Sequence, residues 1–437
     1  MGNWISERAG MRLLSSARRI SDVSPIKGHR ACALLFDESP CAMGDATETI
    51  IDALRSKDGH ATFAVYGSTA ENYPDHRGKK GKESGRGVHY AHLPDLEADD
   101  QGGAEAHPEL VRAILDGGHQ IIASGYRMIP ADKPLFSRRS VLRTVGEVGD
   151  DLRRLTTLCG DPMEAILPPM GGILIRDGFD LYDVCGALGW NCIAPAKTYG
   201  MKFYMSDDPR AEAKRLVRSL AKQLRDDPDA FDGMILRFDG GKSPALRAPL
   251  MSVAAAAIVE QLTNAGYELI TVHELLRRAP FADAEPGDDV FPAARRMTLA
   301  GYTVCCRNNC VRPDCTVTRE MLYAMMTPRD VMIDYISSRI LKTEPVFEQN
   351  KLYEKEFLMA PGSPLTAGMY YGYASGWSLE QRHSAMTQAT FGKFLDQISA
   401  GRDLDWHAPK DGSLTKQDVI LALDQLISAE KAGNNGE

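Results

Sequence analysis

The chain has 437 residues, of which 43% are hydrophobic and 25% charged, with a formal net charge of −8 and an isoelectric point near 5.8. This length predicts two or three domains, since one domain usually takes about 100–200 residues. The acidic balance argues against a nucleic-acid-binding protein, which usually carries a basic face. The sequence contains no run of about 18 apolar residues, so we expect no segment that crosses a membrane.

Short apolar runs alternate with helical patterns between residues 30 and 280. The predicted strands lie at 30–37, 61–67, 119–124, 164–169, 190–195, 233–240 and 267–272. The predicted helices lie at 46–59, 107–118, 145–160, 180–189, 209–227, 249–266 and 273–279. Because each parallel connection needs a helix-length return, the alternation predicts an α/β fold with a (β/α) barrel-like parallel sheet. In such folds the chemistry lies at the carboxyl ends of the strands.

Two stretches interrupt the alternation. Residues 68–106 form a long polar, glycine-rich insertion, and a loop of this length inside a domain is either functional or disordered. Residues 281–296 are rich in proline and aspartate, which indicates a linker. The predicted organisation is an N-terminal extension at 1–29, an α/β domain at 30–280, a linker at 281–296 and an all-α domain at 297–437.

Beyond the linker, three segments begin with a threonine and continue with an apolar stripe, at 318–326, 387–395 and 415–427. A threonine at the N-cap satisfies a backbone N–H that the helix leaves without a partner, so the pattern predicts three helix starts. Two interpretations are open. The segments are either three repeats or parts of a single small helical domain with coincidental caps.

Nine cysteines are present, and four of them cluster at Cys305, Cys306, Cys310 and Cys315. A zinc site, one disulfide and free thiols are the three open alternatives. The adjacent pair Cys305–Cys306 differs from the C-x-x-C spacing of structural zinc sites, which favours free thiols.

The ends of the predicted strands carry LLFDESP, ATFAVYG, GHQIIASGYRM, ILPPMGG, ILRFDGG and ELITVHELL. In this order they resemble the motifs of the polysaccharide deacetylases of carbohydrate esterase family 4. Those motifs are T-F-D-D-G-P, A-T-F-F-V, G-H-E-I-x-N-H-x-x-x-H, R-P-P-x-G, L-H-D and G-Y-x-x-V-T-x-x-x-L-L. The resemblance implies a metal held by one Asp and two His, which polarises an acetamide and activates water. It also implies an Asp as general base and a late His as general acid.

The metal-binding positions of the family are changed in this sequence. The resemblance places the general base at Asp37, which is retained, and the acidic metal ligand at Glu38. The two histidine positions fall on Ser124 and Met128. A hydroxyl and a thioether do not replace imidazole for a divalent ion such as zinc. We therefore expect no metal cofactor and a catalytically impaired domain, a pseudoenzyme that binds N-acetylated cell-wall glycan such as peptidoglycan.

Other positions of the resemblance bear on catalysis and binding. The Arg that orients the base falls on Leu167, and the general-acid His falls on Phe238. Asp239 is kept and is a candidate hydrogen-bonding group in a sugar-binding cleft. Tyr126 is a candidate stacking partner for a sugar ring, with a core position as the alternative. His119, at the start of a strand, is interpreted as a hydrogen-bonded structural residue.

The alternative is an active metal-dependent deacetylase with displaced ligands. The insertion carries His89 and His92, whose imidazoles could bind zinc or another divalent metal if the insertion folded over the strand ends. The resemblance also implies a cell-surface or extracellular location. The N-terminus lacks the apolar segment of an export signal, so a cytoplasmic location is the alternative.

The C-terminal region resembles surface-layer homology repeats, whose core reads G-Y-x-D-G-x-F-R-P-x-x-x-x-T-R-x-E. The positions matched in the first repeat are Gly301, Tyr302, Arg312, Pro313, Thr318, Arg319 and Glu320. The second and third repeats, at 367–395 and 408–426, lack the Arg of the T-R pair. The resemblance implies a secondary cell-wall polymer as a partner, bound through Arg319, because guanidinium makes charge-assisted bidentate contacts with acidic groups.

Overall fold

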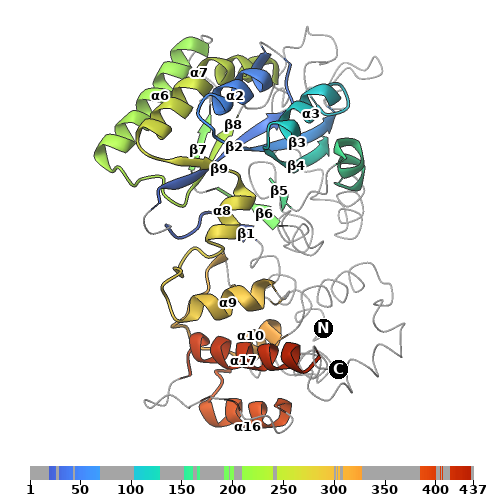
Figure 1. Cartoon of the computed structure of the whole chain (residues 1–437), viewed down its shortest axis with the longest axis vertical. Helices are drawn as coiled ribbons and strands as arrows, with labels where there is room; N and C mark the ends of the chain where they lie inside the picture. Colours follow the sequence, from blue (N-terminus) through green and yellow to red (C-terminus); the bar gives the residue numbers. More distant parts are fainter. Residues whose placement is uncertain are drawn as a thin grey trace, which may run out of the picture. The chain divides into compact units, whose positions relative to one another are not determined.

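A computed structural model of the chain forms two compact units, each described by itself (Figure 1). The N-terminal unit comprises Ile20–Cys185 and Trp190–Pro280, and the C-terminal unit comprises Phe281–Glu437 together with Met1–Arg19 and Gly186–Gly189. The structure describes residues 19–25, 29–42, 45–68, 103–127, 152–160, 165–167, 191–195, 197–200, 209–239, 244–299, 302, 304–305, 309–326, 384–399, 404, 406 and 414–434. None of the helices in these ranges is both long and apolar enough to cross a membrane.

The N-terminal unit is built around a sheet whose order is β1-β6-β5-β4-β3-β2-β8-β7, with β9 also paired to β2. The strands are β1 Arg19–Ile20, β2 Ala31–Ser39, β3 Thr62–Ser68, β4 Gln120–Arg127, β5 Ala165–Ile166, β6 Asn191–Ile193, β7 Lys197–Gly200, β8 Ile235–Asp239 and β9 Glu268–Ile270. All the pairings from β2 to β9 are parallel, which confirms the predicted α/β, (β/α) barrel-like fold.

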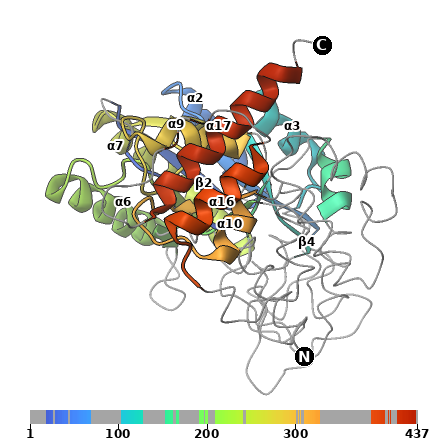
Figure 2. The same cartoon turned by 90° about the horizontal axis from the view of Figure 1, so that it is seen from below.

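Helices connect these strands. They are α2 Ala46–Arg55, α3 Pro108–Asp116, α6 Pro209–Asp226, α7 Pro244–Asn264 and α8 Val272–Arg278. Helix α7 packs against both α2 and α6, and α6 lies outside α7 at the edge of the unit in both views (Figures 1 and 2). Of the helix predicted at 145–160, the described residues 152–159 are helical, and the helix predicted at 180–189 lies outside the described residues.

Side chains alternate between the two faces of the sheet, as the pleat of a strand requires. From β2, Ala33 and Leu35 join an apolar cluster that also contains Ile235 of β8. On the opposite face, Phe36 contacts Phe63 and Phe238, with ring centroids 5.5 and 5.4 Å apart. The central strand β2 is therefore packed on both faces, as is usual for a parallel sheet.

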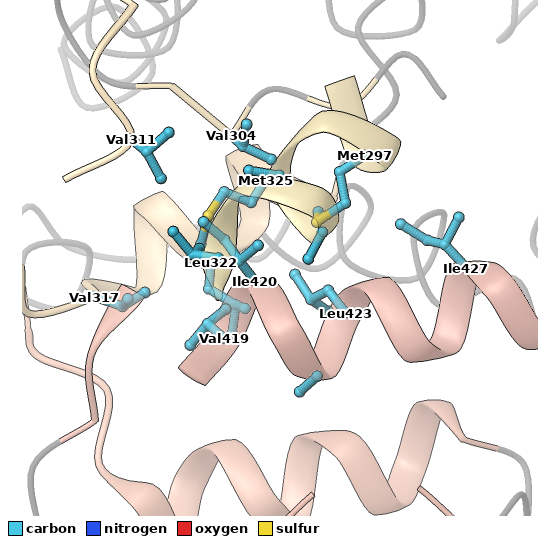
Figure 3. Packing of buried hydrophobic residues seen from close by; sticks show 14 of the residues in the cluster. Met297, Val304, Val311, Val317, Leu322, Met325, Val419, Ile420, Leu423 and Ile427 are labelled. Carbon is cyan, nitrogen blue, oxygen red and sulfur yellow. The ribbon is translucent and has the colours of Figure 1, made fainter. Parts of the chain in front are cut away.

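The C-terminal unit is helical, with α9 Val290–Leu299, α10 Arg319–Met326, α16 Gln388–Ile398 and α17 Lys416–Asn434. Figure 3 shows Met297 of α9, Met325 of α10 and Leu423 of α17 gathered in one buried cluster. Helix α9 packs on α17, and Arg296 forms a bidentate ion pair with Asp424 across this contact.

The prediction that residues 281–296 form a linker is wrong, because this stretch is part of the C-terminal unit. Phe281 is fully buried, and its ring meets that of Phe291 at 5.5 Å between centroids. The carboxylate of Asp283 accepts the backbone N–H of Val311 at 2.6 Å and that of Arg312 at 2.9 Å. Apolar residues scattered among the prolines and aspartates therefore anchor this stretch in the core of the C-terminal unit.

The three predicted threonine caps are confirmed. The hydroxyl of Thr387 accepts the N–H of Thr390 at 3.2 Å, and that of Thr318 accepts the N–H of Met321 at 3.2 Å. Thr415 accepts the N–H of Asp418 at 3.3 Å, while the Asp418 carboxylate accepts the backbone N–H of Thr415 at 2.8 Å. The segments that precede the helices also pair, since Thr316 bridges Thr415 and Thr318 bridges Ala385.

Replacing Thr415 with alanine should lower the free energy of unfolding of the C-terminal unit by about 1 kcal/mol, because the N–H of Asp418 loses its acceptor and the Asp418 carboxylate loses the hydroxyl that donates to it. Urea unfolding of the full chain measures this change. Thr415→Ser keeps the hydroxyl and serves as the control. An alanine variant as stable as the serine variant would show that the cap contributes nothing.

Candidate active site

The site begins at Asp37, near the carboxyl end of β2. Arg237 of β8 donates to Oδ2 of Asp37 from Nε at 3.1 Å and also from Nη2, which forms an ion pair. The hydroxyl of Ser124, on β4, donates to Oδ1 at 3.4 Å. The side chain of Asp37 is 5% exposed and that of Arg237 is 9% exposed, so this ion pair is nearly buried.

The strand register explains why Asp37 and Arg237 meet. Leu35 is paired with Arg237 in the parallel ladder between β2 and β8, so the two side chains share a face. Asp37 is the next residue of β2 on that face. Its carboxylate therefore lies within reach of the guanidinium, one step toward the carboxyl end of the sheet.

Two irregularities in the ladder lie at the site. The β3–β4 register moves from Val65↔Ala123 to Tyr66↔Gly125, which leaves Ser124 as an extra residue. The β2–β3 register shifts between Phe36 and Ser39, on either side of Asp37. Bulges of this kind re-aim side chains, and they are common beside active sites.

The described donors do not fit a catalytic divalent metal. Ser124 supplies a hydroxyl where the family has imidazole, and the Arg237 guanidinium beside Asp37 repels a second cation. Within the described ranges, no three His, Cys, Asp or Glu side chains lie close enough together to hold a metal ion. Other expected ligands are not part of that set: Met128, His89 and His92 lie outside the described residues, as does the side chain of Glu38.

The remaining site predictions on the sheet separate by face. Leu167 follows β5, is 1% exposed and belongs to the same apolar cluster as Leu35. Phe238 lies on the other face, stacked on Phe36 and on Tyr199, with ring centroids 5.4 and 5.5 Å apart. Phe238 is therefore a core residue directed away from Asp37. The side chains of Tyr126 and Asp239 lie outside the described residues, although both positions are in strands.

Sequence reasoning missed Arg237, which takes part in the site where Phe238 does not. The sequence did contain an indication of this role. Arg237 is a charged residue within the apolar run ILRFD, and because it precedes Phe238 its side chain must point to the opposite face of the sheet.

Arg319 belongs to the C-terminal unit. It opens α10, is half-buried, and its backbone N–H donates to the carbonyl of Ser384 at 3.2 Å.

His119 lies just before β4, at the end of the strand opposite Ser124. It is 6% exposed, and its Nδ1 accepts the backbone N–H of Ala61 at 3.3 Å. Burial lowers its pKa to about 4, and the neighbouring His60 adds to this shift. A buried, neutral imidazole that accepts a backbone hydrogen bond has a structural role.

Lowering the pH should destabilise the N-terminal unit through His119. Its pKa is about 4 when folded and about 6.5 when unfolded. Between these values the unfolded chain binds more protons, so stability is full above about pH 6.5 and falls by about 1–3 kcal/mol toward pH 4. Urea unfolding at a series of pH values should show a shallower loss for His119→Asn, whose amide oxygen can accept the same N–H. Equal pH dependence in both proteins would contradict this role.

The parallel sheet carries an acidic residue, Asp37, near the carboxyl end of its central strand. Residues 26–176 match the family model for polysaccharide deacetylase. This stretch of the chain is therefore similar to polysaccharide deacetylase domains. A search of curated proteins gives no significant match.

Solved structures similar to part of this chain include three enzymes or enzyme relatives that carry the family fold. A peptidoglycan deacetylase from Bacillus subtilis is 21% identical over 57% of this chain and 91% of its own, with a TM-score of 0.35. A chitin deacetylase from Colletotrichum lindemuthianum is 18% identical over 61% and 94%, with a TM-score of 0.40. A family 4 pseudoenzyme from Bacillus anthracis is 14% identical over 59% and 68%, with a TM-score of 0.36.

Proposed function

We propose that the domain is a catalytically impaired polysaccharide deacetylase that binds N-acetylated cell-wall glycan without removing its acetyl groups. The observation that supports this most is the hydroxyl of Ser124, which stands at a histidine position of the resemblance and donates to Asp37 at 3.4 Å. The guanidinium of Arg237 balances the charge of this carboxylate, whose family role is to activate water beside a metal.

The resemblance implies an Arg that orients the base, and Arg237 lies beside Asp37 while Leu167 stands at the family's Arg position. The proposed impairment therefore rests on the missing metal ligands and not on the ion pair itself. A guanidinium remains protonated and has no acceptor, so it cannot bind and activate water as a metal does. Water activation would therefore lack the metal, because a hydroxyl and a thioether stand at the two histidine positions, Ser124 and Met128.

Glycan binding is proposed from the family that the domain resembles. The polar groups at the strand ends, with Asp239 and Tyr126 as candidates, would hydrogen-bond and stack on the sugar. We propose further that the C-terminal unit is a degenerate surface-layer homology module that binds cell-wall polymer through Arg319. Both proposals place the protein at the cell surface.

Acetate release from an N-acetylated chitooligosaccharide, with and without added zinc, tests the proposal together with sedimentation on insoluble peptidoglycan. We expect the purified full chain to sediment with peptidoglycan and to release no acetate above the uncatalysed rate. Turnover that a chelator abolishes would overturn the proposal and favour an active enzyme with displaced ligands such as His89 and His92. If the chain did not sediment with peptidoglycan, the proposal that it binds glycan would be refuted, and the proposal that it is catalytically impaired would stand.

A further inference from the structure

Helix α6 carries a row of exposed cations that the deacetylase fold does not use. Lys214, Arg218 and Lys222 follow one another at intervals of four residues, and Arg225 comes three residues later; all four are exposed. At 1.5 Å rise and 100° per residue, successive cations of the first three are about 6 Å apart, and all four lie within a sector of about 80°. We propose that this basic row binds a linear polymer of phosphate groups.

The opposite side of α6 is fixed in the protein. Ala213, Leu216 and Leu220 are buried, and α6 packs on α7. In both views α6 lies at the outer edge of the N-terminal unit (Figures 1 and 2). The basic row is therefore presented on a rigid support, which lowers the entropy lost when it binds.

The charges of the row are not used within the fold. Within the described part of the chain, Lys214, Arg218, Lys222 and Arg225 form no ion pair, whereas the neighbouring Arg215 pairs with Glu212 at 2.7 Å. Like charges four residues apart destabilise a helix by about 0.2–0.5 kcal/mol per pair. The chain as a whole is acidic, with a net charge of −8. A row of like charges on an acidic protein is thus a local exception that an external anion would stabilise.

The geometry of the row favours a linear polymer of phosphates over a membrane or a nucleic acid. A helix that binds lipid inserts apolar side chains, but the exposed residues between Lys214 and Asp226 are arginine, lysine, serine and aspartate. Proteins that bind single-stranded nucleic acid stack bases on aromatic side chains, and α6 contains no aromatic residue. The exposed face of α6 therefore presents positive charges arranged along one line, and a flexible chain of phosphate groups can follow such a line.

Binding of the full chain to fluorescent inorganic polyphosphate tests the proposal. The variant Lys214→Gln/Arg218→Gln/Lys222→Gln keeps good helix formers, so α6 should remain folded by circular dichroism. The control Lys57→Gln/Arg112→Gln/Lys393→Gln removes the same charge from exposed positions on other elements. At low salt we expect binding to weaken at least 10-fold in the first variant, and the slope of log Kd against log salt to fall by about 2. The control should bind almost as tightly as the parent chain.

Three results would overturn the proposal. The first is equal weakening in both triple variants, which would show that net charge and not the row determines binding. The second is no binding of the parent chain to polyphosphate at low salt. The third is a preference for anionic lipid vesicles or for single-stranded RNA over polyphosphate. None of these results bears on the glycan-binding proposal, which the peptidoglycan assay tests separately.

Discussion

Replacing Arg237 with methionine should lower the free energy of unfolding of the N-terminal unit by about 3–5 kcal/mol, because the Asp37 carboxylate would stay buried without its counter-charge. Urea unfolding of the full chain measures the loss. Hydrogen exchange followed by mass spectrometry should place it in β2 and β8. Asp37→Asn should also destabilise the unit, because it leaves the guanidinium without its partner.

Two comparison variants make this prediction specific. Arg55→Met removes a guanidinium from an ion pair with Asp52 whose side chains are 68% and 69% exposed, and it should cost less than about 1 kcal/mol. The double variant Asp37→Leu/Arg237→Met removes both buried charges and should regain most of the lost stability. If Arg237→Met cost no more than Arg55→Met, the ion pair would not be a buried structural element.

Reintroducing the family's ligands should create a metal site. In the variant Ser124→His/Met128→His/Arg237→Met, two imidazoles join the acidic residues at Asp37 and Glu38, and the repelling guanidinium is gone. The hydroxyl oxygen of Ser124 lies 3.4 Å from Oδ1 of Asp37, so the side chain of a histidine at position 124 would lie beside this carboxylate. We expect zinc affinity to rise by at least about 100-fold over the parent chain, measured by competition with a chromogenic chelator.

The matched control is Ser124→Asn/Met128→Gln/Arg237→Met, which has the same loss of charge and side chains of similar size but no imidazole. It should bind zinc no better than the parent chain. In the histidine variant, zinc should also raise the melting temperature, since a ligand that binds only the folded state stabilises it. Equal zinc affinity in the two variants would mean that the backbone at Ser124 and Met128 does not direct ligands to a common point.

Much of the sheet could be predicted because its strands are short apolar runs between clear helix signals. The runs at 30–37 and 61–67 became β2 Ala31–Ser39 and β3 Thr62–Ser68. Edge strands gave less signal: β7 Lys197–Gly200 begins with lysine and ends with glycine, so it was not predicted. The linker prediction failed because composition does not show whether Phe281 and Phe291 find a core.

The site was harder to predict than the sheet. Motif order placed Asp37 and Ser124 at the ends of two strands, and the structure brings these two together across β3. The role of Arg237 depends on the register between β2 and β8 and on the face of the sheet that each residue occupies. Comparison of sequence motifs gives neither of these. The same motif comparison assigned the general-acid position to Phe238, whose ring packs against Phe36 on the opposite face of the sheet.

Elemental mass spectrometry of the purified full chain, after dialysis against zinc and then against metal-free buffer, tests the central claim most directly. That claim is that the site at Asp37 holds no catalytic metal, because Ser124 and Met128 stand at the two histidine positions. We predict that the chain retains only trace zinc, far below one ion per molecule. Stoichiometric zinc that is lost on mutation of Asp37 or Glu38 would contradict the account.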